Sequence, residues 1–416
     1  MNYPQALKYL SSLVDREKKS TVKYKKSLRS FRIHLKAFDE PHKKLKGFLI
    51  GGTKGKGSTA YIVESICRNA HFKTGLFTSP HLISYRERIK VNGKPITKAK
   101  FAALIEEISE VRTDLSVFET LTTMAFMLFL REEVDYSIFE VGLGGRLDAP
   151  NVFDPDVSII TSISYDHTGI LGTTLGQIAK EKAKILRKKK INISAPQNKE
   201  IEEILRKEVD GKIEFVKNYK VISLNEEGTF FELNGEKIST NLIGEIQALN
   251  ASLAITACRR IGIDLGNEKL NETLLNIKIP GRFQIISEKP HIIIDGAHNV
   301  ASIRALRKTI QEIYNRKVLL VFSCLSDKDV KGMLREIKPI VKKIYPTEIP
   351  YVRKMPLNEI KRIVRETSME VADTTGVIEK DIKTAVKDAL NSDIIIVTGS
   401  FYLVGEALRI SSKLVN

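Results

Sequence analysis

The sequence of 416 residues is longer than one hydrophobic core usually fills, so we expect two domains. Its 42% hydrophobic and 7% aromatic content is typical of a globular enzyme and excludes collagen-like and disordered chains. The longest apolar runs are far shorter than the roughly 20 residues of a membrane-spanning helix. Residues 1–10 do not resemble a secretory signal. Three scattered cysteines, Cys67, Cys258 and Cys324, indicate reduced thiols. We therefore expect a soluble protein of the cytoplasm with no membrane partner. We also expect a monomer.

The formal net charge of +17 is unevenly distributed along the chain. Residues 15–46 contain 12 Lys and Arg against 4 Asp and Glu. Such an excess attracts polyanions, either nucleic acids or small substrates with several carboxylates or phosphates. An ordinary solvated surface produces the same pattern. Charge alone does not choose between these interpretations.

Residues 47–52 form a short apolar run that ends in glycines, and apolar side chains then recur at helical spacing over residues 58–70. This pattern predicts a strand, a tight loop and a helix. Further strands are predicted at 74–78, 136–141 and 157–162, and helices at 97–112 and 117–133. Because strands alternate with helices, we expect βαβ units around a parallel sheet.

From residue 212 to residue 240 the pattern changes to short strand-like pieces, with Asn234-Gly235 as a hairpin turn, which predicts a small antiparallel insert. After a helix at 244–261, Pro280 and Gly281 indicate a linker. Beyond it, helices, the last at 401–411, alternate with strands at 291–295, 317–323, 342–345 and 393–398. The sequence thus predicts two α/β domains, residues 1–280 with the insert and residues 281–416 with a second doubly wound sheet.

A glycine-rich loop lies between the first predicted strand and its helix, where backbone N–H groups and the helix dipole bind phosphates. It departs from the strict G-x-x-x-x-G-K-[ST] pattern because Gly57 separates Lys56 from Ser58, so it is a variant phosphate loop. We expect Lys56 to contact the β and γ phosphates and Ser58 a phosphate or Mg²⁺. The alternative is a glycine-rich turn with incidental lysines. The expected ATP-binding residues of this loop are Gly52, Thr53, Lys54, Gly55, Lys56, Gly57, Ser58 and Thr59.

Two further side chains follow predicted strands of the same sheet. Glu140 ends the strand that begins at Tyr136, and His167 lies in the loop after the strand at 157–162. Both belong to the carboxyl edge of the sheet, where open α/β folds bind ligands. Glu140 is therefore a candidate Mg²⁺ ligand. The alternatives are a surface acid at a strand end and, for His167, a structural histidine.

At this point the chain resembles folylpolyglutamate synthase, the folate branch of the Mur ligase superfamily. Besides the glycine loop, the matching motifs are TSPHL at 78–82, ERIKVNG at 87–93, EVGLGGRLD at 140–148, DHT at 166–168, EKA at 181–183, DGAHN at 295–299 and GSFYL at 399–403. The resemblance implies an amino-terminal P-loop-type ATPase domain, a smaller carboxy-terminal Rossmann-like domain, and an active site between them. It also implies ATP-dependent addition of L-glutamate to folate, or to dihydropteroate, through an acyl phosphate.

The resemblance also implies roles for individual residues. Lys182 would be carbamylated by CO₂ and would bind a second Mg²⁺; the alternative is one more exposed lysine in a basic helix at 177–187. The catalytic residues would be Lys56, Glu140, His167 and Lys182. Ligands of the first Mg²⁺ would be Ser79, Glu140 and His167; further ATP contacts would be Asn250, Arg282, Asp295 and His298; pterin contacts would be Phe118, Thr122 and Asp148.

Two other functions share part of this pattern. Another Mur ligase acting on cell-wall precursors would use the same chemistry, but we would not expect it to contain the TSPHL and GSFYL runs. A basic nucleic-acid-binding NTPase would show ATP hydrolysis stimulated by RNA or DNA and a steep salt dependence of binding. The expected partners are ATP, L-glutamate and folate or dihydropteroate, and no nucleic acid.

Overall fold

The structure, a computed structural model, describes residues 1–15, 27–111 and 114–413. The chain forms two compact units. The first contains Met1–Lys220, Phe231–Ser239 and Gln247–Ile277, and the second contains Val221–Phe230, Thr240–Ile246 and Lys278–Asn416. Residues 16–26 of the basic segment at 15–46 lie outside the described residues. No helix in the described ranges combines the length and the apolar composition needed to cross a lipid bilayer.

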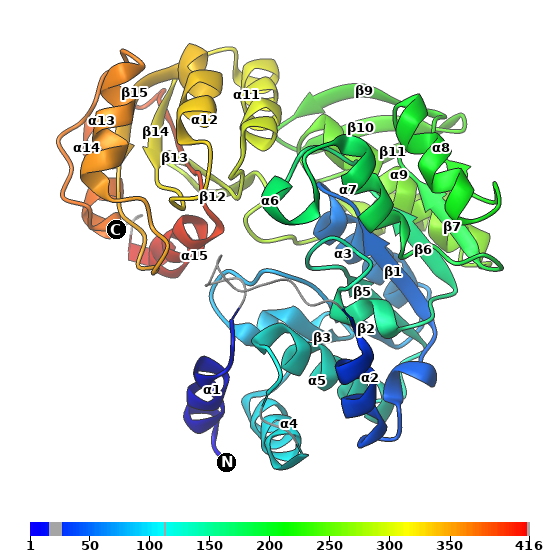
Figure 1. The fold of residues 1–416 in the computed structure, drawn as a ribbon. Coiled ribbons are helices and arrows are strands. Elements are labelled where there is room, and N and C mark those ends of the chain that lie inside the picture. The colour runs from blue at the N-terminus through cyan, green and yellow to red at the C-terminus, as the bar shows by residue number, and fades with distance from the viewer. Residues whose placement is uncertain (16–26, 112–113, 414–416) are drawn as a thin grey trace. The chain divides into compact units, whose positions relative to one another are not determined.

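An eight-stranded sheet organises the first unit, in the order β4-β3-β2-β5-β1-β6-β7-β8 (Figure 1). The six strands from β2 to β8 in that order are parallel, which confirms the predicted parallel sheet. At one edge β3 and β4 add an antiparallel pair that the sequence analysis did not predict. The strands are β1 (Gly47–Gly51), β2 (Thr74–Phe77), β3 (Ile89–Val91), β4 (Lys94–Pro95), β5 (Tyr136–Glu140), β6 (Val157–Ile160), β7 (Ile191–Ser194) and β8 (Glu214–Phe215).

Helices cover both faces of this sheet, so its central strands are apolar on both sides. Phe139 of β5 shows this: its ring centre lies 4.8 Å from that of Phe126 and 5.2 Å from that of Phe153. The helices of the first unit are α1 (Tyr3–Ser12), α2 (Arg29–Lys36), α3 (Lys56–Asn69), α4 (Lys98–Val111), α5 (Val117–Arg131), α6 (Thr168–Leu171), α7 (Leu175–Ala183), α8 (Lys199–Glu208), α9 (Glu245–Arg260) and α10 (Asn267–Leu275).

Helix α7 ends at Ala183, before the predicted end at residue 187. The Arg187 side chain lies at the turn that follows, where its Nη1 donates to the backbone oxygens of Lys184 and Ile185 at 3.2 and 2.9 Å. Its Nη2 donates to the backbone oxygen of Phe153 at 2.9 Å. After Ala183 the backbone hydrogen bonds span three residues, from the Ile185 N–H to the Lys182 oxygen at 3.3 Å and from the Leu186 N–H to the Ala183 oxygen at 2.9 Å, so the α-helix ends and the chain turns toward β7.

The predicted antiparallel insert is a three-stranded sheet, β11-β10-β9, of β9 (Tyr219–Asn225), β10 (Gly228–Leu233) and β11 (Glu236–Thr240). Its β10–β11 turn is the predicted Asn234-Gly235 pair, with φ of 51° and 87°. Strand β8 was predicted within this insert but instead pairs in parallel with β7. The reason is that Ile213, just before β8, is buried in the core of the first unit.

The second unit has a five-stranded sheet in the order β12-β13-β16-β14-β15 (Figure 1). Strand β12 (Gln284–Glu288) is antiparallel to β13 (His291–Asp295), and β14 (Val318–Phe322), β15 (Val341–Pro346) and β16 (Ile394–Thr398) are parallel to it. Helix α12 (Val330–Ile337) packs between α11 (Val300–Tyr314) and α13 (Leu357–Glu366), while α14 (Ile378–Asp388) packs against α15 (Phe401–Ile410). This arrangement confirms the predicted carboxy-terminal α/β sheet.

Candidate active site

The glycine-rich loop connects β1 to α3 and is bonded to the loop after β6. The backbone N–H of Thr53 donates to the backbone oxygen of Ser162 at 2.8 Å. The Thr53 hydroxyl donates to the backbone oxygen of Ser164 at 3.1 Å, and the Ser164 N–H donates back to that hydroxyl at 3.1 Å. Because β6 lies beside β1, the loop that carries Asp166 and His167 is thus held against the glycine-rich loop, as the shared sheet edge predicted.

Two glycines allow the loop backbone to adopt this path. Gly52 and Gly55 have φ of 136° and 89°, which side chains rarely tolerate. A Cβ atom at Gly52 would lie 1.9 Å from the Thr161 hydroxyl oxygen, and one at Gly55 would lie 2.1 Å from Oδ1 of Asn250. That Asn250 Oδ1 atom is buried and has no hydrogen-bond partner within the described residues. A buried acceptor without a donor is unusual in a folded protein, so it fits a site that a ligand completes.

Glu140 lies at the carboxyl end of β5 and is only 4% exposed. Its Oε2 accepts a hydrogen bond from the backbone N–H of Ser79 at 2.9 Å, so the structure brings these two predicted metal ligands together. A Cβ atom at Gly57 would lie 3.4 Å from the same oxygen, which puts the carboxylate beside the first turn of α3. His167 has φ of 49°, its N–H donates to Oδ1 of Asp166 at 3.0 Å, and its side chain is 44% exposed.

Lys182 is buried inside this site, with 4% of the residue exposed. Its Nζ donates to the backbone oxygen of Gly52 in the phosphate loop at 2.7 Å. Burial, aided by the charge of Lys56 and opposed by Asp166 and Asp148, lowers the pKa of Lys182 to about 7. The alternative of an ordinary exposed lysine is therefore wrong.

The predicted pterin contacts meet at the turn after β5. Asp148 accepts hydrogen bonds from the backbone N–H groups of Gly142 and Leu143 at 2.8 and 3.4 Å, yet burial raises its pKa to about 7. The Phe118 ring covers the same turn, since a Cβ atom at Gly142 would lie 2.7 Å from its Cζ. Thr122 is fully buried, and its hydroxyl donates to the backbone oxygen of Phe118 at 2.7 Å. This is the ordinary bond of a helical threonine to the carbonyl four residues earlier, and full burial leaves Thr122 behind the surface that a ligand could contact in this structure.

The remaining predicted ATP contacts lie in the second unit, at the carboxyl end of β13. The Asp295 carboxylate accepts hydrogen bonds from the N–H groups of Phe283 and Ala297, both at 2.8 Å. Burial raises the pKa of Asp295, and the nearby charge of Arg282 counteracts part of that increase. Nδ1 of His298 lies 2.8 Å from the backbone oxygen of Gly296.

Phe401 contacts two of these residues, and the sequence analysis gave it no role. Its ring centre lies 4.6 Å from the Arg282 guanidinium carbon and 5.3 Å from the centre of the His298 ring. The signal that could have found it is its position directly after β16, because β16 pairs with β13 and Thr398 stands opposite Asp295. The GSFYL motif therefore starts at the same sheet edge as the DGAHN motif.

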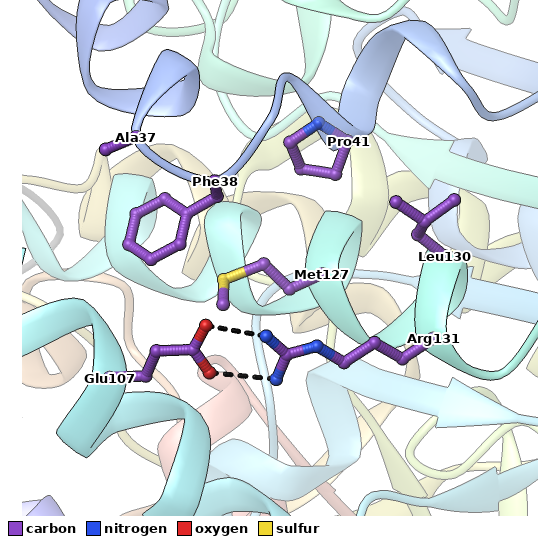
Figure 2. Close-up of a pocket in the computed structure, with 7 residues that line it drawn as sticks. All are labelled: Ala37, Phe38, Pro41, Glu107, Met127, Leu130 and Arg131. Carbon is purple, nitrogen blue, oxygen red and sulfur yellow. Dashed lines mark hydrogen bonds and ion pairs between the residues drawn. The ribbon is translucent and has the colours of Figure 1, made fainter.

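A pocket of about 250 Å³ lies elsewhere in the first unit, between α4, α5 and residues 37–41 (Figure 2). Two hydrogen bonds of 2.6 and 2.8 Å join Glu107 to Arg131 at its side. Its other lining residues are Ala37, Phe38, Pro41, Met127 and Leu130. Leu130 is near the end of α5 and Phe118 near its start, so about 18 Å of helix separates them at 1.5 Å per residue. The pocket is therefore separate from the phosphate-loop site.

Comparison with known proteins gives a consistent result. Residues 50–258 match the Mur ligase middle domain, and residues 281–401 match the Mur ligase glutamate ligase domain. The dihydrofolate synthase/folylpolyglutamate synthase of Buchnera aphidicola subsp. Schizaphis graminum is 33% identical over 98% of this chain and 96% of its own length.

Two solved structures extend the similarity to the fold. Folylpolyglutamate synthase of Mycobacterium tuberculosis, complexed with ADP and AMPPCP, has a TM-score of 0.84 and 30% identity over 92% of this chain and 95% of that chain. Escherichia coli FolC in complex with DHPP and ADP has a TM-score of 0.87 and 27% identity over 100% of this chain and 99% of that chain. The chain therefore belongs to the Mur ligase superfamily and, within it, to the dihydrofolate synthase/folylpolyglutamate synthase family.

Proposed function

We propose that this protein is an ATP-dependent ligase that joins L-glutamate to a folate, or to dihydropteroate, and releases ADP and phosphate. The observation that carries the proposal is the phosphate loop with Glu140 beside Gly57 and Lys182 bonded to Gly52. The similar proteins named above add support, because the name of the Buchnera relative includes both activities and the two solved structures contain ADP.

The reaction has two steps. The γ-phosphate of ATP passes to a carboxylate oxygen of the pterin substrate, which forms an acyl phosphate and ADP. The amine of L-glutamate then attacks the acyl carbon, and the tetrahedral intermediate expels phosphate to leave an amide. Lys56 and the loop N–H groups neutralise and orient the phosphates, so the protein contributes mainly position and charge. We propose that ATP also contacts Asn250 of the first unit and Arg282, Asp295 and His298 of the second.

Mg²⁺ fits the residues of the first unit. No cluster of three or more His, Cys, Asp or Glu side chains in the described part of the chain is suited to hold a metal by itself. Mg²⁺ ordinarily binds through one or two carboxylates together with substrate phosphates and water, which agrees with a single buried Glu140 next to a phosphate loop. We propose that Ser79, Glu140 and His167 hold the ion, which would neutralise phosphate charge when bound.

Lys182 is proposed to react with CO₂ and to bind a second Mg²⁺ as the resulting carbamate. The neutral amine adds to CO₂, a nitrogen–carbon bond forms, and one proton leaves. An ammonium group could not ligate a metal because it has no lone pair. The lowered pKa of Lys182 supports this role, since it increases the neutral amine that reacts.

The pterin is proposed to contact Phe118 and Asp148; Thr122, predicted as a third contact, is fully buried in the helix beneath them. The functional domains are proposed as residues 1–280 and 281–416, in a monomer. Cys67, Cys258 and Cys324 are free and buried, which agrees with a reducing compartment such as the cytoplasm.

One assay tests the function and the substrate together. Purified protein receives ATP, Mg²⁺ and L-glutamate with either dihydropteroate or tetrahydrofolate, and products are identified by mass. We expect each product to gain one glutamate residue, with one ADP formed per amide bond, and we expect no product from the Lys56→Ala variant. ATP hydrolysis without any amide product, or hydrolysis that depends on RNA or DNA, would contradict the proposal.

A further inference from the structure

Phe401 begins helix α15 but is not one of the side chains that fill the core beneath it. Leu403, Val404 and Ala407 of the same helix are fully buried, whereas Phe401 is only partly buried. Because these three residues already fill the core, the partly exposed Phe401 ring at the edge of the sheet is available to contact other side chains.

The Phe401 ring packs against the backbone of Gly296, directly after the carboxyl end of β13. A Cβ atom at Gly296 would lie 2.6 Å from Cε1 of Phe401, so the ring occupies the space that any other residue at position 296 would need. Ser400 caps the helix directly before it, accepting a hydrogen bond from the Tyr402 N–H at 3.1 Å. The position of the ring is therefore set by two fixed backbone elements.

The side chains of Arg282 and His298 both contact the Phe401 ring. The Arg282 guanidinium carbon lies 4.6 Å from the ring centre, within the range of a cation–π interaction. An arginine side chain loses much rotamer freedom when it binds a phosphate, and stacking on an aromatic face removes part of that freedom beforehand. The His298 ring lies 5.3 Å from the Phe401 ring, and its Nδ1 donates to Gly296, because a carbonyl oxygen only accepts.

We infer that Phe401 is a positioning residue that orients Arg282 for nucleotide binding. The inference rests on the proposed function, since it assumes that Arg282 binds ATP. Phe401 itself acts through Arg282. Its contribution therefore disappears when Arg282 is absent.

The test compares Phe401→Leu, which keeps an apolar side chain but removes the aromatic face, with Phe401→Tyr, which keeps the face. We expect Phe401→Leu to raise the KM for ATP and the Kd for ADP about 3- to 10-fold, in line with one cation–π contact, and to leave the KM for L-glutamate unchanged. Phe401→Tyr is expected to stay within about 2-fold of the wild type. The ADP Kd is measured by calorimetry and needs no turnover.

Phe322→Leu is the matched control. Phe322 is the last residue of β14, and its ring is fully buried. It packs against Gly399, which follows the neighbouring strand β16: a Cβ atom at Gly399 would lie 2.7 Å from Cε2 of the Phe322 ring. Its loss is expected to lower the melting temperature without changing the Kd for ADP. A lower melting temperature in Phe401→Leu with an unchanged Kd for ADP would mean that Phe401 only packs, and would overturn the inference.

A double-mutant cycle separates the possible failures. In an Arg282→Ala background we expect Phe401→Leu to change the Kd for ADP by less than about 2-fold, because the two residues act as one unit. Equal effects with and without Arg282 would overturn the inference. If Arg282→Ala leaves the Kd for ADP unchanged while the wild type still ligates glutamate, the inference fails and the ligase function stands. If the wild type forms no amide, the function fails, and the calorimetry still decides whether Phe401 acts through Arg282.

Discussion

Replacement of Lys182 by alanine tests the chemistry of the site most directly. Its Nζ is bonded to Gly52 inside the phosphate loop at 2.7 Å, and burial lowers its pKa from 10.5 to about 7. At pH 7 about half of the amines are then neutral, against about 0.03% at an ordinary pKa. The structure thus raises the form that reacts with CO₂ by roughly a thousandfold.

We expect Lys182→Ala to reduce kcat about 10²- to 10³-fold, the loss typical of removing one group that stabilises transition-state charge. ATP binding is expected to persist, because Lys56 and the loop N–H groups remain. Millimolar acetate or formate is expected to restore part of the activity by supplying carboxylate oxygens in the space that the side chain leaves. Lys182→Arg is the matched control, since arginine stays cationic and cannot form a carbamate, and no rescue is expected.

The pH dependence has a defined sign. Carbamate forms only from the neutral amine, so activation of CO₂-depleted enzyme by added CO₂ is expected to slow about tenfold per pH unit below the folded pKa of about 7. Intact-protein mass spectrometry of the activated enzyme is expected to show the added mass of one CO₂, absent from Lys182→Arg. Full activity in Lys182→Ala, or an unmodified lysine in active, CO₂-saturated enzyme, would refute this reasoning.

Other variants test the rest of the first unit. Lys56→Ala and Glu140→Gln are each expected to abolish ligation while circular dichroism and melting temperature stay close to wild type; turnover in either folded variant would contradict their roles. Gly55→Ala is expected to abolish ADP binding in calorimetry, because its Cβ would lie 2.1 Å from an amide oxygen, whereas Gly211→Ala, at a similar φ of 81° but in open space, is expected to keep it. Burial raises the pKa of Asp148 to about 7 from 3.8, so its contribution to stability is full below pH 3.8 and is lost as the pH rises through 7. Urea unfolding of Asp148→Asn is therefore expected to show a weaker decline between pH 4 and 7, by up to about 1.4 kcal/mol per pH unit; parallel curves would show that this carboxyl does not titrate there.

Much of the fold could be predicted because its signals are local. Strand β13 was predicted at its observed bounds, His291–Asp295, and Asn234-Gly235 was placed correctly at a hairpin turn. Alternating apolar runs and helical periodicity do not depend on distant residues. The wrong predictions concern elements whose ends or partners depend on distant residues. The turn after helix α7 is tied by Arg187 to the distant Phe153 oxygen, and β8 joins the large sheet because Ile213 packs into its core.

The candidate site likewise has features that the sequence predicted and features that depend on the tertiary structure. The sequence by itself predicted where the candidate residues lie, because Lys56 and His167 follow strands and Glu140 ends one at the ligand-binding edge of a parallel sheet. Only the tertiary structure decided their environment. Lys182 is 130 positions from the Gly52 oxygen that it binds, and its lowered pKa comes from burial. The contact of Phe401 with Arg282 likewise joins distant segments. Burial and charge at a site are sums over neighbours from many segments, and no local pattern of residues contains that sum.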